Sequence, residues 1–160
     1  MASVSTRTLK KVDLFKGLTD AELSEIAKFS SAHDCDAGHL CLSLGEKTDS
    51  IQIVLKGRAG VESKIPDAPT GRKDIVLAAL GAGEIYSWSA LMGRVPTASV
   101  RAIEPTKTLH IDAQKLLELC EKNNRIGYIV MKNLASIIST RLKRHRLAIL
   151  AAVTGFGEGW

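Results

Sequence analysis

Ile51-Gln52-Ile53-Val54-Leu55-Lys56-Gly57 is a short apolar run that ends at a lysine and a glycine. An apolar run of this length, bounded by a turn residue, is typical of a buried β-strand. Comparable runs, separated by glycine or polar turns, lie on both sides of it at 40–44, 59–63, 74–80, 98–104 and 107–111. Short strands at this regular spacing predict an all-β roll, barrel or sandwich.

Helical patterns flank the strands. Thr19-Asp20-Ala21-Glu22 matches a capping box, and apolar residues at helical spacing after it predict a helix to about Ser31. Asp112 is a suitable cap for a second helix, which Asn123-Asn124 ends. Apolar residues then recur on one stripe over residues 126–152, so we expect a helix of about 30 residues, roughly 45 Å long at about 1.5 Å per residue.

A helix of that length extends beyond a small β core, so its apolar stripe needs another surface to cover it. A second copy of the same helix is the simplest such surface, and we therefore expect a homodimer through residues 126–152. The alternative is a helix that folds back along its own domain.

Composition limits the class of protein. With 160 residues, 45% of them hydrophobic and 24% charged, the chain fits one folded domain. No stretch approaches the roughly 20 apolar residues that span a bilayer, and the N-terminus lacks a signal-peptide core, so we expect a cytoplasmic protein with no membrane partner. Cys35, Cys41 and Cys120 cannot all pair, which favours reduced thiols. The net charge of +5 favours anionic partners.

The clearest candidate for a functional motif is Gly81-Ala82-Gly83-Glu84, which we expect to lead into a short helical turn ending at Leu91. Glycines before a short helix let backbone amides face an anion, and the helix N-terminus adds partial positive charge. Glu84 would accept hydrogen bonds from hydroxyls such as those of a ribose, and Thr97 and Ser99 add hydroxyl donors nearby. A small phosphorylated sugar fits these groups. The alternative is a plain turn followed by a surface acid, and the chain has neither a dinucleotide fingerprint nor a P-loop.

Taken together, these segments resemble the cyclic nucleotide-binding domain family over residues 9–153. The resemblance rests on Leu14-Phe15-Lys16-Gly17-Leu18 as the N-terminal entry, on 38–46 and 51–57 as glycine-bounded strands, and on 83–100 as the phosphate-binding cassette. The final helices resemble those of the bacterial catabolite-activator branch of the family.

The resemblance implies a mainly β fold with flanking helices. We expect a double-stranded β-helix, or jelly-roll-like β-roll, over about residues 34–111, followed by C-terminal helices over about 112–153. Residues 1–8 and 154–160 are expected to be flexible tails.

The resemblance also implies which residues bind a nucleotide. Glu84 lies at the position that holds the ribose 2′-hydroxyl, and the backbone amides of Gly83 and Ile85 lie where the cyclic phosphate is held. The family's phosphate-pairing arginine is replaced here by Pro96, which has neither charge nor amide proton. Because a contact to an ionised group contributes about 1.5–3 kcal/mol, its loss would weaken binding about tenfold to a hundredfold. Our hypothesis is that Arg94, two residues before Pro96, substitutes for it; the alternative is an exposed loop arginine. The remaining phosphate ligands predicted are therefore Arg94, Thr97, Ala98 and Ser99.

Two other groups of side chains are weaker evidence for a functional site. His33-x-Cys35 and His39-x-Cys41 have some metal-like spacing, but Cys41 lies in an apolar alternating strand, so no metal site is predicted. No nucleophile pairs with His110 and Asp112, so no catalytic residue is predicted and the chain is not expected to be an enzyme.

A basic run lies on the long helix, at Arg141, Lys143, Arg144, His145 and Arg146. Such a run can touch nucleic acid, although it is usually a solvated face. The activators of the family carry a helix-turn-helix after the long helix, for which this chain leaves no room, so sequence-specific DNA binding is not expected.

We therefore expect a regulatory sensor module that binds cyclic AMP or cyclic GMP, with no tightly bound cofactor. It would signal to an effector protein through its C-terminal helix. The alternative is a degenerate family member that acts without ligand as a dimerisation or protein-interaction scaffold, for which Pro96 is the main support.

Overall fold

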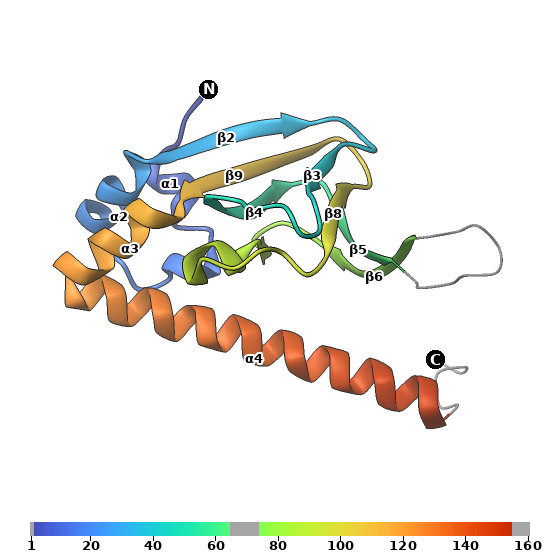
Figure 1. Ribbon diagram of the computed structural model, residues 1–160. Coiled ribbons are helices and arrows are strands. Elements are labelled where there is room, and N and C mark those ends of the chain that lie inside the picture. Colours follow the sequence, from blue (N-terminus) through green and yellow to red (C-terminus); the bar gives the residue numbers. More distant parts are fainter. Residues whose placement is uncertain (1, 65–73, 155–160) are drawn as a thin grey trace.

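The computed structural model describes residues 2–64 and 74–154, in which two antiparallel sheets form a β-roll with helices at one end (Figure 1). The strands are β1 (Ala2–Ser3), β2 (Ser30–Cys35), β3 (Leu40–Leu42), β4 (Ser50–Lys56), β5 (Ala59–Lys64), β6 (Asp74–Leu80), β7 (Ile85–Tyr86), β8 (Ser99–Ala102) and β9 (Thr106–Asp112). The helices are α1 (Thr6–Leu9), α2 (Asp20–Ala27), α3 (Ala113–Lys122) and α4 (Asn124–Thr154), with the short 3-10 helices η1 (Asp13–Phe15) and η2 (Trp88–Met92).

The strand order is β1-β2-β9-β4-β7 in the first sheet and β3-β8-β5-β6 in the second. Helix α4 runs along the underside of the roll from the end where α1, α2 and α3 gather (Figure 1). The prediction of a mainly β fold with flanking helices and a long C-terminal helix is therefore confirmed.

Side-chain alternation in the first sheet separates two hydrophobic cores. One face turns toward the helices and contributes Ile51, Ile53, Ile85, Leu109 and Ile111 to the larger core. The neighbouring positions of β4 and β7 turn the other way, because successive side chains of a strand point to opposite faces. They join the smaller core inside the roll, made of Leu42, Val54, Ala59, Leu80, Tyr86 and Val100.

The helix signals in the sequence are confirmed. Thr19 and Glu22 form the capping box of α2, and the side chain of Asp112 accepts a hydrogen bond from the amide of Lys115 at the start of α3. Helix α4 has 31 residues, in agreement with the predicted length of about 30. Its first half buries Ile126, Val130 and Leu134, whereas residues 142–150 are all exposed.

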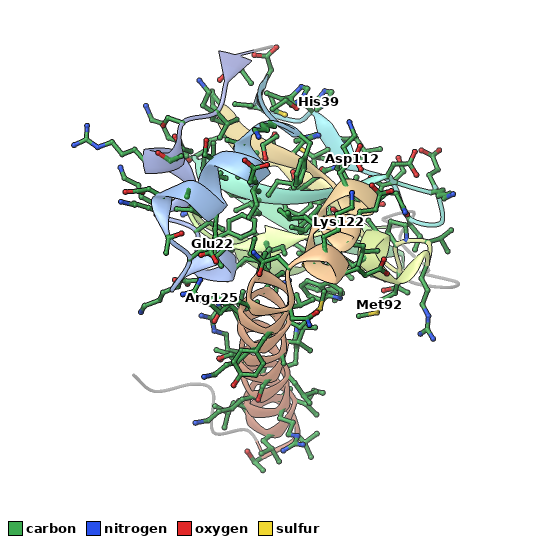
Figure 2. All side chains as sticks on the ribbon, turned by 90° about the vertical axis from the view of Figure 1, so that its left-hand side faces the viewer. Glu22, His39, Met92, Asp112, Lys122 and Arg125 are labelled. Atoms are coloured by element: carbon green, nitrogen blue, oxygen red, sulfur yellow. The ribbon has the colours of Figure 1, made fainter. Side chains whose placement is uncertain are left out.

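Arg125 fastens the start of α4 to the N-terminal segment. Its guanidinium donates hydrogen bonds to the carboxylate of Glu22 and, over 3.1 Å, to the carbonyl oxygen of Gly17. Figure 2 shows Glu22 and Arg125 together beside the first turn of this helix. The hydrogen bond from Arg125 holds the pKa of Glu22 below its ordinary value.

Two predictions near the N-terminus need correction. The first helix ends at Ala27 instead of Ser31, because residues 30–35 pair with β9 and extend the roll four residues earlier than expected. Residues 2–8 were predicted to belong to a flexible tail, but β1 pairs with β2 and α1 follows it. This segment is ordered because Val4 and Leu9 are buried in the larger core. Met1, residues 65–73 and residues 155–160, which include most of the predicted C-terminal tail, lie outside the described residues.

Two further findings concern the described part of the chain. None of its helices has both the length and the apolar character needed to cross a membrane. Within the same residues, no three histidine, cysteine or acidic side chains gather in a way that could hold a metal ion.

Polar side chains cover part of the inner face of the first sheet. The imidazole rings of His33 on β2 and His110 on β9 lie 4.2 Å apart between centroids. His110 Nε2 is 3.1 Å from the hydroxyl of Thr108, and His33 Nε2 is 2.9 Å from that of Ser31. Burial, and then the charge of His33, lower the pKa of His110 to about 4.

This lowered pKa predicts acid sensitivity. The unfolded chain takes up the His110 proton near pH 6.5, whereas the folded chain does so only near pH 4, so stability present above pH 6.5 is lost as the pH falls toward 4. Between pH 7 and pH 4, the free energy of unfolding should fall by about 2 kcal/mol less in His110→Asn than in wild type. This value is already reduced because His110 is partly exposed. Urea unfolding from pH 7 to pH 4 measures it, with His39→Asn, an exposed histidine, as the control. Identical pH profiles for wild type and His110→Asn would contradict the prediction.

Candidate functional site

The segment that links β6 to β8 contains the predicted cassette. Residues 81–84 form the turn after β6, β7 follows, and η2 begins only at Trp88. Ser87, just before η2, has a φ of 56°, a left-handed conformation that is uncommon outside glycine. The sequence predicted that a short helix follows Glu84 directly, and this prediction is wrong. The two-residue strand β7 comes first, because Ile85 and Tyr86 pair with β4.

Backbone groups around Glu84 are engaged within the protein. The amide of Gly83 donates to the carbonyl oxygen of Val54 over 2.8 Å, and the amide of Glu84 donates to that of Gly81 over 3.1 Å. Ile85 pairs with Ile53 of β4. These bonds hold the turn against β4, so the Gly83 amide does not point freely at an anion.

The carboxylate of Glu84 is held from two sides. Its Oε2 accepts a hydrogen bond of 2.8 Å from the amide of Gly81, and its Oε1 accepts one of 3.0 Å from Arg144 of α4. The side chain remains 29% exposed, because it borders a cavity of about 280 Å³. Residues of η1, β7 and α4 line this cavity together with Gly83 and Glu84.

A second arginine of α4 reaches the same segment. Arg141 donates a hydrogen bond of 2.9 Å to the carbonyl oxygen of Ile85, and its guanidinium carbon lies 4.6 Å from the ring centroid of Trp88. Burial lowers the pKa of Arg141, while the charge of Glu84 acts in the opposite direction. Arg141 and Arg144 were read from the sequence only as part of a basic run, and their contacts with the cassette were missed.

The other predicted site residues lie elsewhere. Arg94 is exposed, and its amide donates to the carbonyl oxygen of Ser89 over 3.0 Å. Pro96 is buried, and its carbonyl oxygen accepts from the amide of Gly45 over 2.9 Å. The hydroxyl of Ser99 accepts from the amide of Leu44 over 3.0 Å. None of the predicted ligands Arg94, Thr97, Ala98 and Ser99 lines the cavity beside Glu84, although Gly83 and Ile85 do.

Tyr86 occupies the interior of the roll. Its side chain is only 2% exposed and packs in the smaller core, and burial raises the pKa of its phenol. Among the described residues, the Tyr86 hydroxyl, Gln52 Oε1 and Ser89 Oγ are buried without a hydrogen-bond partner. Gln52 and Tyr86 pair across β4 and β7. Since unsatisfied buried polar atoms are costly, the roll interior beside these two side chains is suited to receive further polar groups, from water or a ligand.

Comparison with known proteins supports the same assignment as the sequence motifs. The sequence profile of the cyclic nucleotide-binding domain matches residues 33–123, more than half of the chain. A cGMP-dependent protein kinase of Caenorhabditis briggsae is 30% identical over 113 residues, which are 69% of this chain. The chain spans only 15% of the length of that kinase.

Two solved structures share the fold. A cyclic nucleotide-binding domain from Methylobacillus flagellatus matches with a TM-score of 0.78 and 22% identity, over 92% of this chain and 81% of that one. The catabolite activator protein of Thermus thermophilus matches with a TM-score of 0.69 and 22% identity, over 88% of this chain and 63% of that one.

The ion pair between Glu84 and Arg144 gives a prediction about α4. Glu84→Gln keeps an oxygen for the Gly81 amide but removes the charge, so we expect the middle of α4 to open more readily. Because the pair is partly exposed, global stability should change by less than about 1 kcal/mol. Amide hydrogen exchange over residues 137–147 measures the effect. Glu25→Gln, which removes an exposed acid paired with Lys28, is the control. Exchange in Glu84→Gln that matches this control would show that the pair does not hold α4.

Proposed function

Because the chain belongs to the cyclic nucleotide-binding domain family, we propose that it is a regulatory module that binds cyclic AMP or cyclic GMP. In this proposal the ligand acts on the cassette, and α4 transmits the change to an effector protein. One similar protein is a cGMP-dependent protein kinase and another is a catabolite activator protein, and both names describe regulation, which supports a signalling role.

One observation carries the proposal: α4 touches the cassette at three points. Arg144 pairs with Glu84, while Arg141 bonds the carbonyl oxygen of Ile85 and lies over Trp88. Since a ligand shifts an equilibrium only through differential contacts, residues shared by the cassette and α4 are where binding can bias the helix.

We place the ligand on the Glu84 side of the cassette, because that side has a cavity. A ribose hydroxyl would donate to the Glu84 carboxylate, which now accepts from Arg144. The ligand and Arg144 would then meet at the same carboxylate, so binding would alter the contact that holds α4.

Isothermal titration calorimetry with cyclic AMP and cyclic GMP tests the proposal. We expect at least one of them to bind with a dissociation constant below the millimolar range and to change the fluorescence of Trp88. Glu84→Gln should weaken binding about tenfold, since it removes the charged acceptor of the ribose hydroxyl. Glu25→Gln should bind as wild type does. Millimolar or absent binding of both nucleotides to well-folded protein would reject the proposal.

The scaffold alternative also has structural support. Pro96, at the family's arginine position, is buried, and the bulky side chain of Tyr86 packs in the roll interior. If the chain is a ligand-free scaffold, it should bind neither nucleotide, and its association state should be the same with and without them.

We further propose that the chain forms a homodimer through residues 126–152. The second half of α4 exposes large apolar side chains at 54–78% of their surface, namely Leu142, Leu147, Ile149, Leu150 and Val153. Large apolar residues clustered on one exposed helix are typical of a surface that a partner covers, and a second α4 offers a matching stripe.

Introducing negative charge on this apolar surface tests the dimer. Leu142 and Ile149 lie two helical turns apart on one face, so the double variant Leu142→Glu, Ile149→Glu should raise the dimer dissociation constant about 30-fold or more. Sedimentation equilibrium measures the constant, and circular dichroism checks that the helix is retained. Lys143→Glu is the control for added negative charge. A wild-type protein that stays monomeric at high micromolar concentration would contradict the dimer.

A further inference from the structure

The second half of α4 carries a face that is both basic and apolar. Lys143, Arg146, Leu147 and Leu150 follow one another at spacings of three, one and three residues, so they lie on one side of the helix. All four are exposed, and Leu147 and Leu150 each leave 57% of their surface open. These four residues are called the basic-apolar face below.

This face is separate from the stripe that we assign to the dimer. Successive residues of a helix are turned by about 100°, so Leu142 and Ile149 lie almost in line, whereas Leu147 and Leu150 lie about a third of a turn to one side of them. A second α4 that packs on Leu142 and Ile149 therefore leaves the basic-apolar face largely uncovered.

The charge of α4 decides what kind of partner this face fits. The helix has six arginines and lysines among its 31 residues and no aspartate or glutamate. Arg144 pairs with Glu84, but within residues 2–64 and 74–154 neither Lys143 nor Arg146 has a carboxylate within 4.0 Å. A second α4 cannot neutralise these cations, because it carries no acid either. The matching partner presents negative charge beside apolar surface.

A second apolar projection lies at the same end of the molecule. Ile75, Val76 and Leu77 are between 45% and 58% exposed, and they belong to β6, which lies at the edge of its sheet. Figure 1 shows the start of β6 and the last turns of α4 at the end opposite to the one where α1, α2 and α3 gather. A single acidic helix of a partner protein covers one of these projections, whereas a broad surface meets both. An anionic bilayer is such a surface, because it has charged headgroups above apolar chains.

We infer that the basic-apolar face of α4 docks on an anionic membrane surface. Lys143 and Arg146 contact the lipid headgroups, and Leu147 and Leu150 enter the boundary between the headgroups and the acyl chains. Our expectation of no membrane partner rested on the lack of a spanning segment, and binding at headgroup level needs no such segment. The inference goes beyond the proposed function, since nucleotide binding plays no part in it.

Co-sedimentation with lipid vesicles tests the inference. The vesicles contain phosphatidylcholine alone, or phosphatidylcholine and phosphatidylserine in equal parts, so that only the second kind is anionic. The proteins are wild type and the double variants Lys143→Gln, Arg146→Gln and Leu147→Ser, Leu150→Ser. The control Lys11→Gln, Lys122→Gln removes two exposed cations from the opposite end of the molecule, where Figure 2 labels Lys122. Circular dichroism checks that each variant keeps its helices.

We expect wild type to bind the anionic vesicles at low salt, to leave them at high salt and to ignore the neutral ones. A cation beside an anionic bilayer strengthens binding about fivefold, so Lys143→Gln, Arg146→Gln should weaken it roughly 25-fold. Leu147→Ser, Leu150→Ser should weaken it about tenfold or more, because apolar burial contributes to interfacial binding. The control should bind within about twofold of wild type, since distant charges are screened.

Three outcomes would overturn the inference. The first is a wild-type protein that stays in solution with anionic vesicles at low salt. The second is equal weakening in the Lys11→Gln, Lys122→Gln control, which would indicate only a diffuse attraction of the net charge. The third is a Leu147→Ser, Leu150→Ser protein that binds vesicles as wild type does but forms a weaker dimer by sedimentation equilibrium, which would assign this face to a contact between copies. None of these results changes the expectation for nucleotide binding.

Discussion

The apolar core that the first half of α4 shares with η1, with α3 and with the helix-facing side of the first sheet is the constraint on which the rest of the structure depends. Ile126, Val130 and Leu134 are buried in the same core as Ile53 and Ile85. This packing fixes how far α4 lies from β7, and so it brings Arg141 and Arg144, two and three turns after Leu134, within reach of the cassette. The charged contacts are weak by themselves, because they are partly exposed. They become specific because the apolar core has already placed both partners.

The interior of the roll poses the opposite problem. Here Tyr86 adds bulk, while Gln52 and Tyr86 itself contribute buried polar atoms without partners in the described residues. Such a region is neither a well-packed apolar core nor an open pocket. The cavity beside Glu84 lies outside it, between the sheet and α4, where hydroxyl and cationic groups gather. The chain thus has a polar cavity under α4 that Glu84 borders, and this is why we place the ligand against α4.

Much of the fold could be predicted from local patterns. The capping box at Thr19 and Glu22, the Asp112 cap and most of the strands are set by residues close together in the sequence. Strand β7 was missed because two residues are too few to show alternation. The environment of Glu84 was also out of reach, since its partner Arg144 lies 60 positions away and the family resemblance did not point to it. Long-range charge pairing leaves no periodic pattern, although the spacing of the polar residues on α4 was a usable signal.

The anchored first half of α4 gives the rest of the helix the mechanics of a lever. Arg125 holds the first turn to Glu22 and Gly17, and the core holds the helix as far as Leu134, so the pivot lies near Leu134. At about 1.5 Å per residue, Arg144 lies about 15 Å beyond Leu134 and Thr154 about 30 Å beyond it. A rigid helix displaced at Arg144 would therefore move its far end through about twice the original displacement. Small rearrangements beside Glu84 would thus become larger displacements at the C-terminal end of α4, where Leu147 and Leu150 are exposed.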